Sequence, residues 1–310
     1  MAQFLLIPKR IARALPVLGR ASQWLEAQAF RFIFWFVNTL SPENASALAA
    51  FAFGLVGPHT AKAGKAETNL AIAFPDESAQ WRRHTVKQIF RYLGKSAAEL
   101  IKLQQIWIER DQRLEFDLRP GIEEILDARA PVVYVSAHVG AWQLTNLLAL
   151  RYQLSISTVY ATESNPAMQK MLFKLREYFG VKLIPTDAGV RPLLKELKDG
   201  NSIGLAMDTR LDTGQMLPFF GRDALTNTSA ARLALLSGAA LVPVRAQRLG
   251  KARYKITIYE PLVSSNPDAS TEEQANDLSR QINSHFEQWI TDNPEQWICL
   301  KRRWPKANKL

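Results

Sequence analysis

The spacing of hydrophobic and polar positions changes near residue 120. Between residues 78 and 108, apolar side chains recur at helical spacing, which predicts one long helix. After Pro120-Gly121, short apolar runs alternate with amphipathic stretches, two of which end at Gly180 and Gly200. This alternation favours an α/β domain with a mixed, largely parallel sheet and helices on both faces.

The predicted strands also indicate where a ligand site belongs. Strands are expected at 131–137, 155–161, 181–186, 202–208, 239–247 and 254–262, and helices at 121–130, 142–152, 168–180, 190–200 and 229–238. Sheets of this kind bind ligands at the carboxyl ends of their strands. Because His138 and Asp208 both lie at such ends, they are candidates for a site.

The first 66 residues follow a different pattern. Two short apolar stretches, at 29–37 and 47–57, are separated by the sequence NTLSPEN, whose Ser-Pro pair is typical of a helix start. Neither reaches the roughly 18 apolar residues of a spanning helix. We therefore expect residues 1–66 to form membrane-associating helices and residues 67–310 to form the α/β domain. The alternative is that both stretches are core helices of a soluble domain.

Charge favours an anionic partner. The net charge is +10, and residues 1–66 hold seven Lys or Arg against two Glu. The last ten residues, KRRWPKANKL, add five basic residues and no acidic ones. Basic residues beside Phe and Trp suit an anionic membrane surface, and the sequence has no nucleic-acid-binding motif. One cysteine and four scattered histidines provide no metal-binding pattern, so neither a metal nor a bound cofactor is expected.

The segment AHVGAWQ, residues 137–143, is the main candidate for chemistry. His138 follows an apolar strand, Gly140 permits close approach of backbone or ligand, and Trp142 can form a wall of a cleft. A neutral imidazole there can take a proton from a hydroxyl that attacks an acyl carbonyl. A purely structural histidine is the alternative.

The sequence from His138 to Gln143, HVGAWQ, resembles a motif of the lipid A biosynthesis acyltransferases, a family of the lysophospholipid acyltransferase superfamily. That motif is His, four residues, then Glu or Asp, typically HFGNWE. Similar segments occur at 160–166 (YATESNP), at 206–244, and at 293–305 (NPEQWICLKRRWP). The resemblance extends over roughly residues 24 to 305.

The resemblance implies a glycerolipid acyltransferase-like fold and an O-acyltransferase. The donor would be an acyl carrier protein or acyl-CoA thioester, and the acceptor a hydroxyl of a lipid, by default a lipid A precursor. The expected location is the cytoplasmic face of a bacterial inner membrane, as a peripheral or monotopic protein. His138 would be the general base and Gln143 its orienting partner. The expected substrate-binding residues are Asp208, Arg210, Arg191, Asn165, Gly221, Arg222 and Trp142.

Several alternatives stay open for these residues. For Asp208 and Arg210 the alternative is a simple ion pair, and Arg302 and Arg303 either contact the site or headgroups or belong to a solvated basic tail. Ala161 stands where the resemblance would place an arginine, which motivates a lyso-aminolipid or lysophospholipid as a second acceptor class.

Gln143 is the main departure from the family motif, because an amide supplies no charge to stabilise an imidazolium. Three explanations compete. Gln143 is a substitution that traps a substrate complex, or a natural change compensated by a carboxylate such as Asp208 or Glu163, or the mark of a lipid-binding relative that has lost catalysis.

Overall fold

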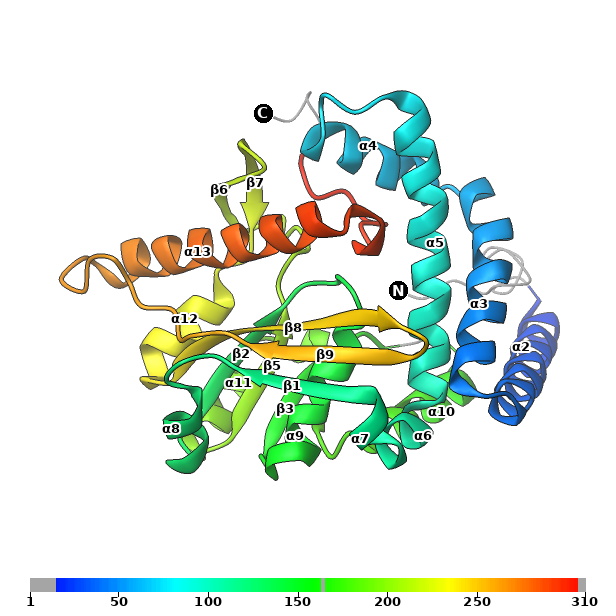
Figure 1. The fold of residues 1–310 in the computed structure, drawn as a ribbon, viewed down its shortest axis with the longest axis horizontal. Helices are drawn as coiled ribbons and strands as arrows, with labels where there is room; N and C mark the ends of the chain where they lie inside the picture. The colour runs from blue at the N-terminus through cyan, green and yellow to red at the C-terminus, as the bar shows by residue number, and fades with distance from the viewer. Residues whose placement is uncertain (1–14, 163–164, 306–310) are drawn as a thin grey trace.

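A seven-stranded sheet forms the centre of the computed structural model, which describes residues 15–162 and 165–305 (Figure 1). Its strand order is β1-β9-β8-β2-β5-β3-β4, and all neighbours are parallel except β8 and β9. The mixed, largely parallel α/β fold expected from the sequence is confirmed. The strands are β1 (Leu114–Leu118), β2 (Val132–Ser136), β3 (Ile156–Tyr160), β4 (Lys182–Pro185), β5 (Ser202–Ala206), β8 (Ala240–Gly250) and β9 (Arg253–Ile258).

Alternation along the central strand β2 divides the core into two clusters. Val133 and Val135 pack on one face of the sheet with apolar residues of α12 and α13, whereas Val132 and Tyr134 pack on the other face with α9. A strand buried on both faces requires a continuous apolar run, which is what VVYV supplies. The helices that follow β1 are α8 (Ile122–Asp127), α9 (Leu147–Tyr152), α10 (Pro166–Glu177), α11 (Arg191–Lys198), α12 (Ser229–Ser237) and α13 (Thr271–Asp292).

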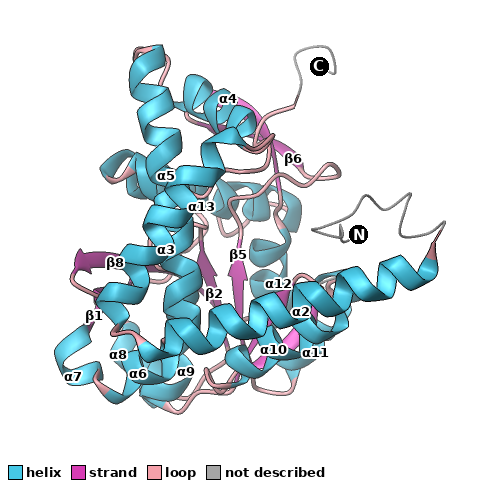
Figure 2. Cartoon of the chain, turned by 90° about the vertical axis from the view of Figure 1, so that its right-hand side faces the viewer, coloured by secondary structure: helices cyan, strands magenta, loops and turns pink. Residues whose placement is uncertain are grey.

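The N-terminal helices stand together at one side of the sheet (Figures 1 and 2). They are α2 (Pro16–Thr39), α3 (Pro42–Val56), α4 (Ala63–Ala73) and α5 (Ala79–Ile101). Ser41 caps α3 by accepting from the Asn44 N–H, and Pro42 occupies the first turn, as the Ser-Pro signal indicates. Within the described residues, no helix is long and apolar enough to cross a membrane. Helix α4 runs across residue 66, the expected domain boundary.

The structure differs from the sequence pattern in three places. The helix expected over 78–108 is interrupted at Lys102, so that α5 is followed by the short helices α6 (Leu103–Ile108) and α7 (Arg110–Arg113). Strand β1 and the antiparallel hairpin of β6 (Gln215–Phe219) and β7 (Arg222–Thr226) were not expected. Long-range pairing stabilises these short strands, and local periodicity does not reveal such pairing.

Candidate active site

Two neighbouring strands bring a histidine and a carboxylate together. Strands β2 and β5 pair in parallel with Ser136 opposite Ala206, so the segments that follow the two strands leave the sheet at the same edge. Two residues further along each chain lie His138 and Asp208, whose Nδ1 and Oδ1 atoms are 2.7 Å apart. Since an ionised carboxylate only accepts hydrogen bonds, Nδ1 carries the hydrogen and Nε2 is left with its lone pair.

Asp208 is fixed by further donors. Its Oδ1 also accepts from the backbone N–H of His138 at 3.0 Å, and its Oδ2 accepts from the indole N–H of Trp297 at 3.1 Å. The aspartate is 4% exposed, whereas the His138 side chain is 32% exposed. The carboxylate is therefore held inside the protein, and the imidazole faces the solvent side of the site.

The C-terminal segment, residues 293–305, forms backbone hydrogen bonds with the loop that carries His138. The backbone N–H of Ile298 donates to the His138 carbonyl at 2.8 Å, and the Gly140 N–H donates to the Gln296 carbonyl at 3.2 Å. Gly140 has a φ of +64°, and a Cβ atom at this position would lie 2.3 Å from the Ala246 carbonyl oxygen. Only glycine fits between the loop and β8, so Gly140 is required for the position of His138.

The pair shifts the pKa of each partner. Burial would lower the His138 pKa, but the charge of Asp208 and the hydrogen bond to it outweigh burial and raise this pKa above its ordinary value, against the opposing charge of Lys301. Burial would raise the Asp208 pKa, but the charge and hydrogen bonds of His138, together with the Trp297 N–H, lower it. The geometry thus favours a charged aspartate beside a histidine that binds a proton more strongly than free imidazole.

Gln143 does not contact His138 in the way the sequence motif led us to expect. Its side-chain NH₂ donates to the Ser96 carbonyl on α5 at 3.3 Å, and the backbone carbonyl of Gln143 accepts from the Asn146 side-chain NH₂ at 3.1 Å. Residues 142–146 form a short 3₁₀ helix, which carries Gln143 away from the Nδ1 side of the imidazole. The position expected for Gln143 is filled by Asp208. Glu163, the other carboxylate considered, lies outside the described residues.

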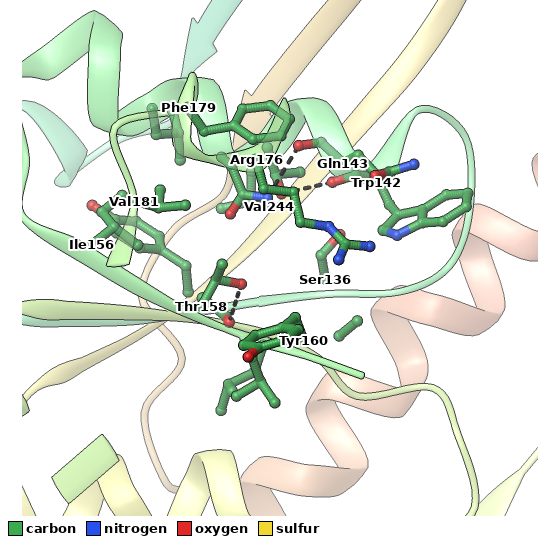
Figure 3. Close-up of a pocket in the computed structure, with 18 of the residues that line it drawn as sticks. Ser136, Trp142, Gln143, Ile156, Thr158, Tyr160, Arg176, Phe179, Val181 and Val244 are labelled. Carbon is green, nitrogen blue, oxygen red and sulfur yellow. Dashed lines mark hydrogen bonds between the residues drawn. The ribbon is translucent and has the colours of Figure 1, made fainter. Parts of the chain in front are cut away.

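A cavity of about 290 Å³ opens beside His138 (Figure 3). Strands β2, β3 and β5 form its floor, and Trp142 stands at its rim with its ring centroid 5.4 Å from that of His138. Ala161 and Arg176 also line it. A cavity that begins at a histidine and continues over the sheet can hold part of a substrate next to the reactive nitrogen.

A second, basic hollow is formed by the residues that follow Asp208 in the chain, by Lys65 and by the C-terminal segment around Lys301. It is lined by Leu211, Asp212 and Thr213 and by four cationic side chains, which we call the basic cluster: Lys65, Arg210, Lys301 and Arg302. Arg210 forms an ion pair with Asp212 at 2.8 Å, so the alternative of an Asp208–Arg210 ion pair is wrong. One member of the cluster, Lys301, lies near enough to His138 for its positive charge to act on the imidazole.

The remaining residues expected from the sequence lie elsewhere. Arg191 begins α11 and is exposed, Gly221 lies in the turn of the β6–β7 hairpin, and Arg222 is the exposed first residue of β7. Asn165 is 4% exposed and connects α10 to α2 by donating to the Gln23 carbonyl at 2.8 Å. None of these four lines the cavity or the basic hollow in the part of the chain that the structure describes.

Arg303 is buried and does not belong to a solvated tail. It donates to the Leu225 carbonyl at 2.9 Å and to the Thr226 hydroxyl at 2.8 Å, and it stacks over the Phe219 ring. Burial lowers its pKa to about 10. Arg303 therefore anchors the C-terminal segment to β7 and leaves Arg302 and Lys301 at the basic hollow.

Sequence reasoning missed Trp297, Lys65 and Lys301. Trp297 lies in the segment NPEQWICLKRRWP, whose family resemblance could have indicated it, but its hydrogen bond to Asp208 spans 89 residues. No local signal links Lys65 to Lys301. Among the described residues, no group of three His, Cys, Asp or Glu side chains could hold a metal ion.

Fold and site together define an α/β protein with a His-Asp pair at the carboxyl ends of parallel strands and a cavity beside the histidine. The family model of the bacterial lipid A biosynthesis acyltransferases matches residues 12–306. The chain belongs to this family and is an acyltransferase.

Individual relatives are distant. A lipid A biosynthesis acyltransferase of Haemophilus influenzae is 23% identical over 76% of this chain and 73% of its own length. A phosphatidylinositol mannoside acyltransferase of Mycolicibacterium smegmatis is 26% identical over 58% of each chain. The lipid A biosynthesis myristoyltransferase of Escherichia coli is 23% identical over 78% of this chain and 76% of its own. The crystal structure of a 1-acyl-sn-glycerophosphate acyltransferase from Thermotoga maritima covers 80% of this chain and 98% of its own, at 12% identity and a TM-score of 0.37.

Proposed function

We propose that this protein moves a fatty acyl group from a thioester, carried by acyl carrier protein or CoA, to a hydroxyl of a lipid acceptor. His138 is the general base and Asp208 orients it. The observation that carries this proposal is the 2.7 Å contact between His138 Nδ1 and Asp208 Oδ1, beside a cavity at the carboxyl ends of the strands.

The reaction follows from this arrangement. Nε2 of His138 takes the proton of the acceptor hydroxyl while the hydroxyl oxygen attacks the thioester carbonyl. Asp208 stabilises the imidazolium that forms. When the tetrahedral intermediate collapses, the C–S bond breaks and the thiolate takes the proton from the imidazolium, so that an ester and a free thiol are released and His138 is neutral again. Positive charge from the basic cluster favours the oxyanion of the intermediate.

Asp208 also provides an account of Gln143. The family motif places its carboxylate five residues after the histidine, but the imidazole requires only that a charged acceptor lie within hydrogen-bond reach of Nδ1, wherever it stands in the sequence. Asp208 meets this requirement from a neighbouring strand. A natural change at position 143, compensated by Asp208, is the explanation that we favour over a trapped mutant or a lipid-binding relative.

We propose that the acceptor carries an anionic group that the basic cluster binds. The relatives named above include enzymes of lipid A and of phosphatidylinositol mannoside biosynthesis, so acceptors vary within similar sequences. Lipid A precursor and a lyso-aminolipid or lysophospholipid are the two acceptor classes to compare. Ala161 lines the cavity where the resemblance would place an arginine, which favours the second class.

We further propose that α2 and α3 lie against the cytoplasmic face of a bacterial inner membrane, where cytoplasmic thioesters are available. These helices expose many large apolar side chains, which suit the acyl boundary of a bilayer. The exposed residues are Val17, Leu18, Trp24, Leu25, Phe32, Ile33, Trp35, Phe36, Leu48, Phe51, Phe53, Leu55 and Val56.

The first experiment measures acylated lipid by mass spectrometry after incubation with acyl carrier protein thioester or acyl-CoA and a panel of lyso-lipids. Wild-type protein should turn over. His138→Ala should abolish transfer, and Asp208→Asn should lower the rate about 10³- to 10⁴-fold, as a comparable change does in a protease triad.

Gln143→Glu is the matched control. It keeps the size of the side chain but places a carboxylate against the Ser96 carbonyl, so it should not raise the rate. If only Gln143→Glu turns over, Gln143 disables the site and this protein is an inactive form that traps its substrate. If wild-type protein binds lyso-lipid without consuming thioester and Gln143→Glu does the same, the protein is a lipid-binding relative.

A further inference from the structure

Gly204 occupies the middle of β5, where glycine is unusual because it weakens a strand. Its backbone is not in the left-handed region, so its conformation does not require glycine. A Cβ atom at this position would lie 3.8 Å from Asn146 Oδ1, Ile156 Cγ2 and Thr158 Oγ1, which is ordinary van der Waals contact. A Cβ atom would therefore fit without a clash and would occupy space in the cavity that Gly204 lines.

The strand register shows how far from His138 Gly204 lies along the cavity. Ser136 and Ala206 are paired nearest to His138, Tyr134 and Thr158 flank Gly204 one step deeper, and Ile156 lies one step deeper again. Cavity-facing residues alternate along a strand, so each step of two residues is about 6.6 Å and the two steps together are about 13 Å. Gly204 thus lies at mid-depth on the floor of the cavity.

The chemical character of the walls changes with depth. Ser136, Gln143 and Trp142 gather at one end, and Ile156 and Val181 at the other, with Thr158 between them (Figure 3). Thr158 donates its hydroxyl hydrogen to the Gly204 carbonyl at 3.0 Å, which satisfies this polar group. Polar groups near the histidine and apolar groups at the far end match a carbonyl group followed by a hydrocarbon chain. Apolar side chains along the cavity besides Trp142 are Leu148, Ile156, Phe179, Val181, Leu183 and Val244, of which Leu183 is paired with Thr158 at mid-depth.

The volume limits the length of such a chain. A cavity of about 290 Å³ holds about ten methylene groups if each takes up about the 30 Å³ of a water molecule in the liquid. We infer that this cavity holds a medium-length acyl chain and that Gly204 determines the longest chain it admits. The inference rests on the proposed acyl transfer. The chain belongs either to the thioester donor or to the acylated lipid acceptor, and both present the same hydrocarbon.

Binding without turnover is measured first, by titration calorimetry with saturated fatty acids from hexanoate to palmitate below their critical micelle concentrations. Wild-type affinity should rise with length to about decanoate and then stop rising. Gly204→Val should weaken decanoate binding roughly 10- to 100-fold, the range for one misfit group in an apolar pocket, and should affect hexanoate far less. Gly204→Ala should give a smaller shift in the same direction.

Gly64→Ala is the control, because a Cβ atom at Gly64 would meet no atom within 4 Å and this residue lines neither hollow. It should keep the wild-type length profile. Circular dichroism and the melting temperature establish that each variant is folded, and if Gly204→Val does not fold, the Gly204→Ala profile decides. A folded Gly204 variant with the wild-type length profile would overturn the inference.

Turnover then identifies the source of the chain. Donor thioesters of increasing length are compared with a fixed acceptor, and lyso-lipids of increasing length with a fixed donor. The series in which Gly204→Val shifts the optimum to shorter chains identifies the molecule whose chain enters the cavity. If no thioester is consumed, the proposed reaction fails but fatty-acid binding still tests Gly204. If transfer occurs and neither optimum shifts, the reaction stands and the Gly204 inference fails.

Discussion

At the scale of single residues, the site depends on what lies within reach of His138 Nδ1. The motif position five residues later holds an amide, and that amide bonds to the Ser96 carbonyl. Asp208 bonds to Nδ1 and is itself held by Trp297. A general base of this kind requires a charged acceptor at hydrogen-bond distance, whatever its place in the sequence.

The raised pKa of His138 predicts the pH dependence of transfer. The base must be neutral, so kcat/KM should rise with pH through an apparent pKa above the ordinary 6.5. Asp208→Asn removes the charge that raises this pKa and leaves the burial that lowers it. The rising part of the kcat/KM profile against pH should therefore move to lower pH while the maximum rate falls. Gln143→Glu should shift this part of the profile less. NMR titration of the His138 ring measures the change in its pKa directly.

The prediction fails if Asp208→Asn leaves the His138 titration in place. In that case the aspartate would support the loop only through its hydrogen bond with the His138 backbone N–H, and another group would set the pKa of the imidazole.

At the scale of elements, a buried ion pair joins helix α5 to strand β8 behind the site. Arg248 donates from Nε and Nη2 to both carboxylate oxygens of Glu99, each at 2.6 Å, and Nη2 also donates to Ser96 Oγ. The side chains of Arg248 and Glu99 are 6% and 4% exposed. Because the Ser96 carbonyl also receives the Gln143 side chain, this pair supports the wall of the cavity from outside.

Breaking the pair on one side should be costly. Glu99→Gln leaves the Arg248 charge buried without its counter-charge and should lower the free energy of unfolding by about 3 to 5 kcal/mol. The double variant Glu99→Leu/Arg248→Met removes both charges and should be clearly more stable than Glu99→Gln. Urea unfolding followed by circular dichroism measures both. An equal loss of unfolding free energy in the single and double variants would mean that lost packing, and not the uncompensated charge of Arg248, causes the destabilisation.

At the scale of the whole molecule, apolar exposure is concentrated on the side formed by α2 and α3. Trp24, Phe32, Trp35 and Phe51 are each more than 60% exposed there. Together with the net charge of +10, this surface is suited to an anionic bilayer, because apolar rings enter the acyl boundary and basic side chains contact headgroups.

Vesicle flotation tests the membrane surface. The triple variant Phe32→Ser/Trp35→Ser/Phe51→Ser should lose most of its binding to vesicles of phosphatidylethanolamine and phosphatidylglycerol, since each side chain removes buried apolar area. The control is Leu236→Ser/Val263→Ser, which replaces apolar residues that are 63% and 74% exposed outside these helices. Equal binding by both variants would show that α2 and α3 do not form the membrane surface.

The α/β class of the fold could be predicted from the sequence, and so could the positions of His138 and Asp208 at the carboxyl ends of strands, but not their pairing. Alternating apolar runs and glycine-terminated helices specify strands and helices locally, so β2 and β5 and the residues that follow them could be expected at the active edge. That these two strands are neighbours, although 70 residues separate His138 from Asp208, is visible only in the folded structure. The folded structure also shows that Gln143 bonds to α5 and that Trp297 supports the aspartate. The physical reason is that strand order and the return of the C-terminal segment depend on burial of the whole core, whereas periodicity reports only which face of each element is apolar.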